Sequence, residues 1–255
     1  MQTLFTYCLY IMPVLAVLVF IALYFVEAGY GIAFDKKWGV SVPNKLGWFL
    51  MEFPVFAVIL IIGLMAPKQP SVVPYIFLVF FELHYFQRVF VFPFLLKGKN
   101  RMPVSIMCTG IVFNILNAFM QGYWIFFAAP ADLYTVSWLS TPQFIIGTVV
   151  FFTGMFINMQ SDYIIRHLRK NADDKRHYLP QDGMFKFVTS ANYFGELTEW
   201  LGFAILTWSF AGLIFFIWTF ANLVPRAHKI HQRYRKEFGE EMLKLNPKRV
   251  IPFIY

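Results

Sequence analysis

The sequence predicts an all-α membrane protein, with seven transmembrane helices that form a single domain over residues 1–255. Composition is the first observation: 58% of the residues are hydrophobic and only 14% are charged, whereas soluble domains are about 45–50% apolar and about 25% charged. The second observation is a series of long apolar runs, and the third is the distribution of lysine and arginine between them. Together they indicate an integral, multi-pass membrane protein.

Seven apolar runs reach the length that a membrane helix requires, about 20 residues. The first run lacks a basic leader and a clear small-residue cleavage site, so we interpret it as a retained span and not as a signal peptide. The last two runs are close enough to form a tight hairpin. In chain order, the predicted spans cover residues 4–26, 46–65, 72–96, 104–128, 141–163, 192–208 and 210–231.

The basic residues test this count of spans. All but Lys68 and Arg88 of the 22 lysines and arginines lie in the segments after spans one, three and five or in the C-terminal segment that begins at Arg226, near the end of span seven. Positive residues collect in cytoplasmic loops, and seven spans place these four segments on one side of the bilayer. We therefore expect an N-terminus outside and a C-terminus in the cytosol. A face with this excess of positive charge would attract an anionic cofactor, although fixing the topology is enough to explain most of these cations.

Ionisable side chains interrupt the second and third spans. Each costs about 2.5–3.5 kcal/mol at bilayer depth and therefore marks a functional site by default. Glu52 precedes Pro54, which frees a backbone carbonyl and can open the helix locally. Glu52 could hold or share a proton, or it could pair with Arg88. Glu82, Tyr85 and Arg88 are spaced three apart, so that either charged group could tune Tyr85 as a proton donor.

Two polar stripes lie near the predicted cytosolic ends of spans five and six. The members of each stripe share one helix face at about 100° per residue. Each residue alone could equally form an interhelical hydrogen bond worth about 0.6–2 kcal/mol, but together the stripes resemble two walls of a cytosol-facing pocket for a polar ligand. The first stripe contains Asn158, Asp162, Arg166 and Arg169, and the second contains Asn192, Glu196 and Glu199.

Several kinds of site are excluded by the motifs. Gly29 and Gly31 do not complete a dinucleotide fingerprint, and the chain contains no phosphate loop, no HExxH and no CxxC motif. His228 and His231 are three apart and could bind a metal, but with five histidines in all a di-iron centre is disfavoured. We expect no metal and no nucleic-acid partner.

Six motifs occur in an order that resembles the steroid 5α-reductase family. The resemblance extends over nearly the whole chain and is especially close around Glu52. The motifs occupy residues 48–54, 84–88, 158–163, 191–196, 231–234 and 251–255.

The resemblance implies a seven-helix enzyme that uses NADPH to reduce the 4,5 double bond of a 3-oxo-Δ4 steroid. Hydride would go to C5 of the steroid, and Glu52 and Tyr85 would hydrogen-bond the 3-oxygen on which negative charge develops. The neighbouring carbon would then take a proton through water. The lipophilic substrate would arrive from the bilayer, and we expect the protein to be a monomer among membrane lipids.

The family's binding residues are carried over to matching positions of this chain. For NADPH, resemblance points to Asn158, Asp162, Arg166, Arg169, Tyr178, Asn192, Glu196, His231 and Tyr234, with Arg88 and Arg226 as further candidates. For the steroid body, it points to Tyr30, Trp48, Phe113, Trp218 and Leu223. The short polar loops and the lack of a glycosylation sequon fit a bacterial homologue in the inner membrane; a eukaryotic homologue would lie in the endoplasmic reticulum.

The substrate stays open, because Met51, Gln87, Thr109 and Ile230 depart from residues of close relatives. One alternative is a reductase of another lipid enone, such as an enoyl-thioester or a polyprenal. A second is a membrane methyltransferase of similar architecture that binds S-adenosylmethionine. A third is a lipid transporter or sterol-binding protein without enzymatic activity, in which the polar stripes line a path.

Overall fold

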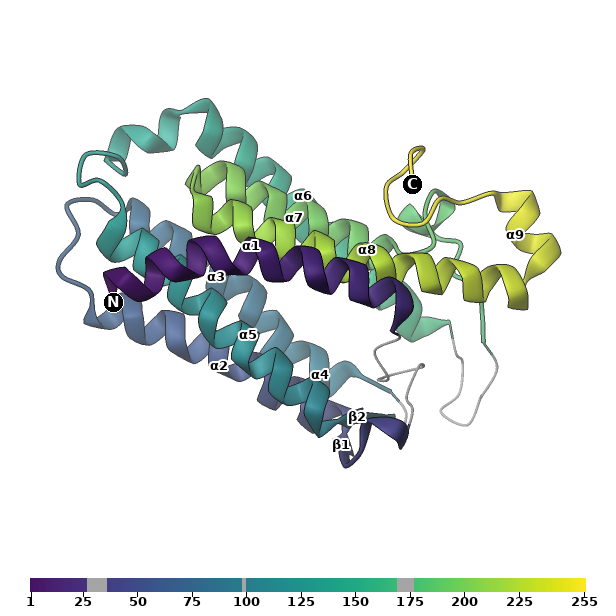
Figure 1. Ribbon diagram of the computed structural model, residues 1–255. Coiled ribbons are helices and arrows are strands. Elements are labelled where there is room, and N and C mark those ends of the chain that lie inside the picture. Colours follow the sequence, from purple (N-terminus) through teal and green to yellow (C-terminus); the bar gives the residue numbers. More distant parts are fainter. Residues whose placement is uncertain (27–35, 98–99, 169–176) are drawn as a thin grey trace. The chain divides into compact units, whose positions relative to one another are not determined.

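The computed structural model describes residues 1–26, 36–97, 100–168 and 177–255 (Figure 1). The chain forms two compact units, and their border passes through three of the helices. The first unit contains Met1–Ile11, Ala28–Ile145 and Ser209–Ala211, and the second contains Met12–Glu27, Ile146–Trp208 and Gly212–Tyr255.

The described residues are mostly helical, which confirms the predicted all-α class. Three short 3₁₀ turns, at Lys36–Trp38, Val136–Ser140 and Gly183–Lys186, lie between the helices. The α-helices are α1 (Gln2–Phe25), α2 (Asn44–Met65), α3 (Val73–Phe86), α4 (Phe92–Leu95), α5 (Val104–Tyr123), α6 (Pro142–His167), α7 (Ala191–Thr207), α8 (Phe210–Glu237) and α9 (Gly239–Leu245).

Six helical stretches of the described chain are long and apolar enough to cross a membrane, and they coincide with six of the seven predicted spans. They are Gln2–Phe25, Asn44–Met65, Val73–Leu95, Val104–Ala128, Pro142–His167 and Phe210–Glu237. The remaining predicted span forms α7, which has 17 residues and ends where Trp208 turns into the left-handed conformation at φ 46°. α8 begins two residues later, which confirms the tight hairpin. The count of seven spans and their orientation stay predictions.

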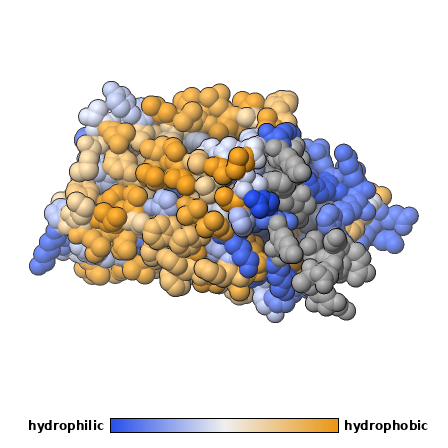
Figure 2. Space-filling model, turned by 90° about the horizontal axis from the view of Figure 1, so that it is seen from below, coloured by the Kyte–Doolittle hydropathy of each residue, from blue (hydrophilic) through white to orange (hydrophobic). Residues whose placement is uncertain are grey.

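The surface also fits a membrane protein. Figure 2 shows that hydrophobic residues cover the middle of one face, and that hydrophilic residues gather toward its ends. Many large apolar side chains of the predicted spans are exposed, among them Tyr10, Leu64 and Phe156 at 73%, 77% and 63%. Lipid tails would cover such side chains at no cost.

In the first unit, α2 packs against both α3 and α5 (Figure 1). Glycines allow these helices to approach closely. A Cβ atom on Gly63 of α2 would lie 2.8 Å from the Leu78 side chain of α3, and one on Gly122 of α5 would lie 2.9 Å from Ile62. Near the other end of α5, Gly110 packs against the side chain of Met51 in the same way.

Each of α3 and α5 is followed by a π-helical turn, at Gln87–Val91 and Trp124–Ala128. In the first turn the N–H of Phe92 donates to the carbonyl of Gln87, five residues back. The next residue is Pro93, which has no N–H to continue the α-helical pattern. The π turn changes the direction of the side chains that follow Tyr85, and such turns are frequent at functional sites. By contrast, α2 continues through Pro54 without a break.

A two-stranded antiparallel ribbon joins the loops that follow the first and third spans. Its strands are β1 (Ser41–Pro43) and β2 (Arg101–Pro103), in a register that places Ser41 opposite Pro103. Each strand leads directly into a helix, α2 or α5. The pairing places these two loops at the same end of their helices, as the distribution of cations predicts.

In the second unit, α6 and α7 pack with almost no side chain between their backbones. Gly147 and Gly154 of α6, and Gly195 and Gly202 of α7, are each two turns apart. A Cβ atom on Gly154 would lie 2.2 Å from the backbone nitrogen of Glu199, and one on Gly195 would lie 2.4 Å from that of Asn158. These helices can approach so closely only because the four positions carry no side chain.

We expect Gly154→Ala to lower the stability of the protein by about 1–3 kcal/mol, the usual cost of overpacking a core. The added methyl group meets backbone atoms of α7, which cannot rotate away. Thermal unfolding in detergent measures the effect. Gly239→Ala is the matched control, because no atom lies within 4 Å of a Cβ atom at that position. Equal midpoints for the two variants would contradict the close packing.

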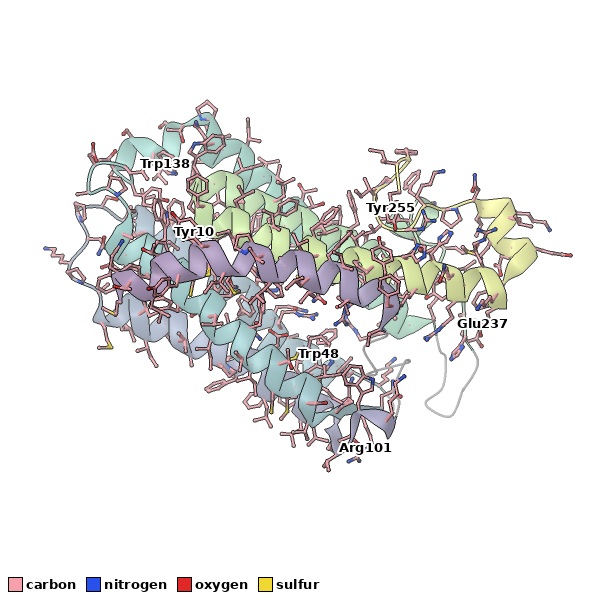
Figure 3. The ribbon with its side chains drawn as sticks, viewed as in Figure 1. Tyr10, Trp48, Arg101, Trp138, Glu237 and Tyr255 are labelled. Atoms are coloured by element: carbon pink, nitrogen blue, oxygen red, sulfur yellow. The ribbon has the colours of Figure 1, made fainter. Side chains whose placement is uncertain are left out.

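The C-terminal segment folds back on the second unit (Figure 3). Val188 pairs with Lys248 in an isolated β-bridge, and the N–H of Ser190 donates to the carbonyl of Arg249. Tyr255 lies 3.1 Å from the Tyr24 hydroxyl, and its ring lies 4.5 Å from the Arg249 guanidinium. The segment before α7 and the C-terminal segment thus lie at the same end of this unit, as predicted.

Candidate functional site

Glu52 is buried in the first unit, with 9% of its surface exposed. It lies on the face of α2 that also buries Val55, Ile59 and Gly63. A carboxyl group in such apolar surroundings is costly unless it is hydrogen-bonded. The amide nitrogen of Asn114, on α5, lies 3.2 Å from Glu52 Oε2 and meets this requirement in part.

Tyr85 is buried on α3, with 3% of its surface exposed, and its ring contacts those of Phe81 and His84. The contact between Gly63 and Leu78 sets how α3 runs back along α2. Glu52 lies eleven residues before Gly63, and Tyr85 lies seven residues after Leu78. Glu52 therefore lies on the same face of α2 as Gly63, about 16.5 Å away along the helix axis. Tyr85 lies on the same face of α3 as Leu78, about 10.5 Å away. The geometry of two regular helices thus predicts that Glu52 and Tyr85 face each other from α2 and α3, about one helical turn apart.

Arg88 lies in the π turn after α3 and is buried between two aromatic rings. Its guanidinium lies 4.7 Å from the ring centre of Trp48 and 4.3 Å from that of Phe92. Such contacts stabilise a cation out of water by about 2 kcal/mol. Trp48, which the resemblance assigns to the steroid, thus also contacts a residue that the resemblance assigns to the cofactor. Phe113 is half-buried on α5, next to Asn114.

The two predicted polar stripes meet in the second unit. The amide of Asn158 donates to the backbone carbonyl of Asn192 at 2.9 Å, and the amide of Asn192 lies 3.4 Å from Asp162 Oδ1. Asn158 and Asp162 are buried, whereas Asn192 and Glu196 are half-buried. These bonds hold the start of α7 against α6. Asn158 thus forms an interhelical hydrogen bond, the alternative role considered for each residue of the stripes. Glu199 is fully buried one turn further along α7.

The remaining residues assigned to the cofactor lie in the same unit. Nδ1 of His231 lies 3.4 Å from the Thr189 hydroxyl, and Arg226 donates to the amide oxygen of Asn222 at 2.9 Å. Three more are half-buried: Arg166 on α6, Tyr178 between α6 and α7, and Tyr234 on α8.

A polar, anionic dinucleotide fits the chemistry of this unit. Among the buried polar atoms of this unit that have no hydrogen-bond partner in the described chain are Ser161 Oγ, Ser190 Oγ, His228 Nδ1 and Arg249 Nε. Such atoms are rare and call for a partner. Two belong to basic side chains and two to hydroxyl groups, which suit phosphate and ribose oxygens.

Four predicted residues have a different setting or lie outside the described residues. Trp218 donates from its indole nitrogen to the carbonyl of Met12 at 2.8 Å, and Leu223 is buried with Leu197, Val224, Ala227 and Val250. Within the second unit these two therefore help to build the packing. Tyr30 and Arg169 lie outside the described residues.

Sequence reasoning missed a polar stripe on α5. Asn114, Asn117 and Gln121 are all buried there, and Gln121 donates both to Asn117 and to the carbonyl of Ala211. Their spacing of three and four residues along an apolar span was a visible signal of the same kind as the stripes in spans five and six.

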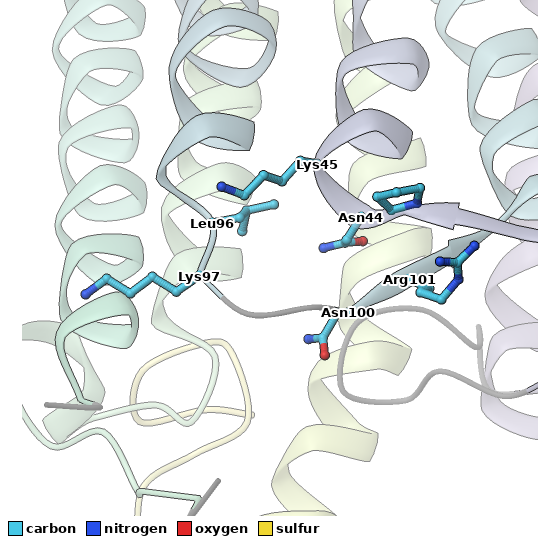
Figure 4. A pocket seen from close by; sticks show the side chains of 7 residues that line it. Asn44, Lys45, Leu96, Lys97, Asn100 and Arg101 are labelled. Carbon is cyan, nitrogen blue, oxygen red and sulfur yellow. The ribbon is translucent and has the colours of Figure 1, made fainter. Parts of the chain in front are cut away.

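A basic hollow of about 300 Å³ opens at the ribbon end of the first unit (Figure 4). Arg101 donates there to the Ser41 hydroxyl at 2.8 Å. None of the predicted site residues lines it. Its lining residues are Pro43, Asn44, Lys45, Leu96, Lys97, Asn100 and Arg101.

Comparisons with known proteins agree with the resemblance. Residues 100–255 match the family described as 3-oxo-5-alpha-steroid 4-dehydrogenase. Steroid 5-alpha-reductase DET2 of Arabidopsis thaliana is 37% identical over 266 aligned residues, which cover 100% of this chain and 98% of that protein. DET2 of Gossypium hirsutum is 36% identical over the same shares of both chains. Human 3-oxo-5-alpha-steroid 4-dehydrogenase 1 is 37% identical over 85% of this chain and 82% of its own.

Proposed function

Because the chain belongs to the steroid 5α-reductase family, we propose that it reduces the 4,5 double bond of 3-oxo-Δ4 steroids to 5α-dihydro products with NADPH. Membership makes the protein an oxidoreductase that acts on a CH–CH bond. The steroid substrate, the cofactor and the roles of individual residues are the content of the proposal.

The reaction adds a hydride to C5 and a proton to C4, so that one carbon–carbon π bond is replaced by two carbon–hydrogen bonds. NADPH, when bound, supplies the hydride. As the hydride arrives, the π electrons move toward the ketone and negative charge develops on the 3-oxygen. C4 then takes up a proton as the electrons move back from the 3-oxygen, and we assign water as the source of this proton.

Glu52 and Tyr85 stabilise the charge on the 3-oxygen by donating hydrogen bonds to it. Donors that are already aimed at the developing oxyanion are often the largest single term in catalysis. The observation that supports this role most strongly is that the carboxyl group and the phenol are both buried, on two helices, α2 and α3, that pack against each other in the first unit. Exclusion of water from their surroundings strengthens both hydrogen bonds.

Residues of the second unit hold the dinucleotide in this proposal. Asn158, Asp162 and Asn192 offer amide and carboxylate groups, Arg166 and Arg226 offer cations for phosphate, and the imidazole of His231 offers a hydrogen-bonding nitrogen. Their role is to bind and orient the cofactor.

Turnover by the purified protein tests the proposal. The protein in detergent is mixed with NADPH and a 3-oxo-Δ4 steroid, and the loss of reduced-nicotinamide absorbance and the mass of the product are followed. We expect a product heavier by two hydrogens. A panel with an enoyl-thioester and a polyprenal identifies a reductase of another lipid enone. Methyl transfer from S-adenosylmethionine without reduction of any enone would overturn the proposal.

Arg169→Gln is expected to raise the NADPH concentration needed for half-maximal rate about tenfold, the value of one charge-assisted hydrogen bond. The expected effect on kcat is small, because the change removes binding that is equal in the ground and transition states. Cofactor titration at saturating steroid measures both. Lys186→Gln is the control, because this exposed cation lies in the same segment between α6 and α7. An unaltered NADPH requirement would remove Arg169 from the site.

A further inference from the structure

Asn114 joins α5 to α2 through its side-chain amide. Its nitrogen lies 2.7 Å from the backbone carbonyl oxygen of Met51 and 3.2 Å from Glu52 Oε2. Only 5% of its surface is exposed. The two hydrogens of the amide thus go to two neighbouring residues of one helix.

The first of these bonds determines how the amide is oriented. A backbone carbonyl can only accept, so the group that faces Met51 must be the NH₂ of Asn114 and not its oxygen. The same nitrogen then donates its second hydrogen to Glu52 Oε2. Oε2 is therefore an acceptor, which favours Oε1 as the oxygen that carries a proton when the carboxyl group is protonated.

We propose that Asn114 is a positioning residue: it fixes the Glu52 carboxyl group so that Oε2 faces α5 and the protonated Oε1 is presented to the ketone oxygen of the substrate. The inference rests on the proposed function of Glu52. Without Asn114, Oε2 loses the donor that marks it as the acceptor oxygen, and the orientation of the carboxyl group is less strictly fixed. The donor would then no longer be aimed before charge develops.

The surrounding packing keeps Asn114 in this place. Gly110, one turn earlier on α5, lies against Met51, and a Cβ atom at Gly110 would be 2.5 Å from the Met51 sulfur. This close approach brings the backbone of α2 within reach of a side chain as short as asparagine. Asn117, three residues further along, belongs to a different network, because its amide oxygen accepts from Gln121 at 3.2 Å.

Three variants of the full-length protein test the role: Asn114→Leu, Glu52→Leu and the double variant. Leucine has the same number of side-chain heavy atoms as asparagine and branches at the same carbon, but it donates no hydrogen bond. We expect Asn114→Leu to lower kcat for the 3-oxo-Δ4 steroid about tenfold, the scale of one hydrogen bond. The expected change in NADPH affinity, measured by quenching of tryptophan fluorescence, is less than twofold. In the Glu52→Leu background, which has no carboxyl group to position, Asn114→Leu is expected to cause no further loss comparable to this.

Asn117→Leu is the matched control, because it makes the same chemical change at a position 2% exposed on the same helix. We expect it to shift the unfolding temperature about as much as Asn114→Leu while leaving kcat within about twofold. Full activity of Asn114→Leu, equal losses in both asparagine variants, or losses that multiply in the double variant would overturn the positioning role.

The stability of the same variants separates this inference from the proposed function. Asn114→Leu and Glu52→Leu are expected to shift the unfolding temperature non-additively, because both break the same bond. Wild-type protein that reduces no enone would overturn the proposed function and the positioning role with it, even when this coupling is present. Turnover by the wild type together with additive temperature shifts would overturn only the positioning of Glu52 by Asn114.

Discussion

Glu52→Gln is expected to lower kcat about 10²–10³-fold, as the loss of one preorganised oxyanion donor does in other enzymes. The carboxyl group of Glu52 is buried in α2 and accepts from Asn114 through Oε2. Glutamine keeps the shape of the side chain and can still donate, but its amide N–H is a weaker acid than a carboxyl O–H. The difference becomes larger as negative charge grows on the 3-oxygen, so the loss falls on the transition state.

Single-turnover rates with saturating NADPH and steroid measure this loss, and the dissociation constants of both ligands are measured separately. The constant for NADPH is expected to change less than twofold. Glu240→Gln makes the same chemical change in the first turn of α9, on an exposed residue, and is the control. Normal single-turnover rates in Glu52→Gln would show that this carboxyl group is structural.

Tyr85→Phe is expected to lower kcat about 10²-fold, the lower range for the loss of a positioned proton donor. The variant removes one oxygen atom and leaves the ring against Phe81 and His84, so the packing of α3 is conserved. Because Tyr85 and Glu52 would donate to the same oxygen, the losses in the double variant are expected to be smaller than the product of the single losses.

Tyr75→Phe is the control for this prediction. Tyr75 lies two to three turns earlier on α3, is 37% exposed, and packs against Phe126. Rates are measured as for Glu52, with the unfolding temperature as a check on folding. A rate for Tyr85→Phe equal to that of Tyr75→Phe would remove the phenol from the reaction.

Much of the fold could be predicted from the sequence because a membrane span must satisfy all its backbone hydrogen bonds within one long apolar helix. The boundaries of α2 and of Val73–Leu95 lie within two residues of the predicted ones. α8 instead extends to Glu237, six residues beyond its prediction. Its last part is basic and helical but not apolar, and hydropathy reports only the apolar part. The short ribbon of β1 and β2 was missed, because three residues give no periodic pattern.

The residues of the candidate site could be found by asking which polar groups interrupt apolar runs. This reasoning selected Glu52 and Tyr85, and it selected the two stripes that the structure joins through Asn158, Asp162 and Asn192. It missed Asn114, because a neutral amide interrupts an apolar span less clearly than an ionisable group does. It could not assign partners, because spacing along one helix does not reveal which residue of another helix lies opposite.

The ribbon at the start of α2 and α5 has a mechanical consequence for the chemistry. Pro43 and Pro103 end the paired strands and act as the N-caps of the two helices. Glu52 lies nine residues after Pro43 on α2, and Asn114 lies eleven residues after Pro103 on α5. Along the helix axes these separations are about 13.5 Å and about 16.5 Å. The ribbon therefore fixes the positions at which α2 and α5 begin relative to each other. One residue inserted after either proline would rotate the rest of that helix by about 100° and separate the Asn114 amide from the Glu52 carboxyl group. Both residues would still lie in a fully formed helix.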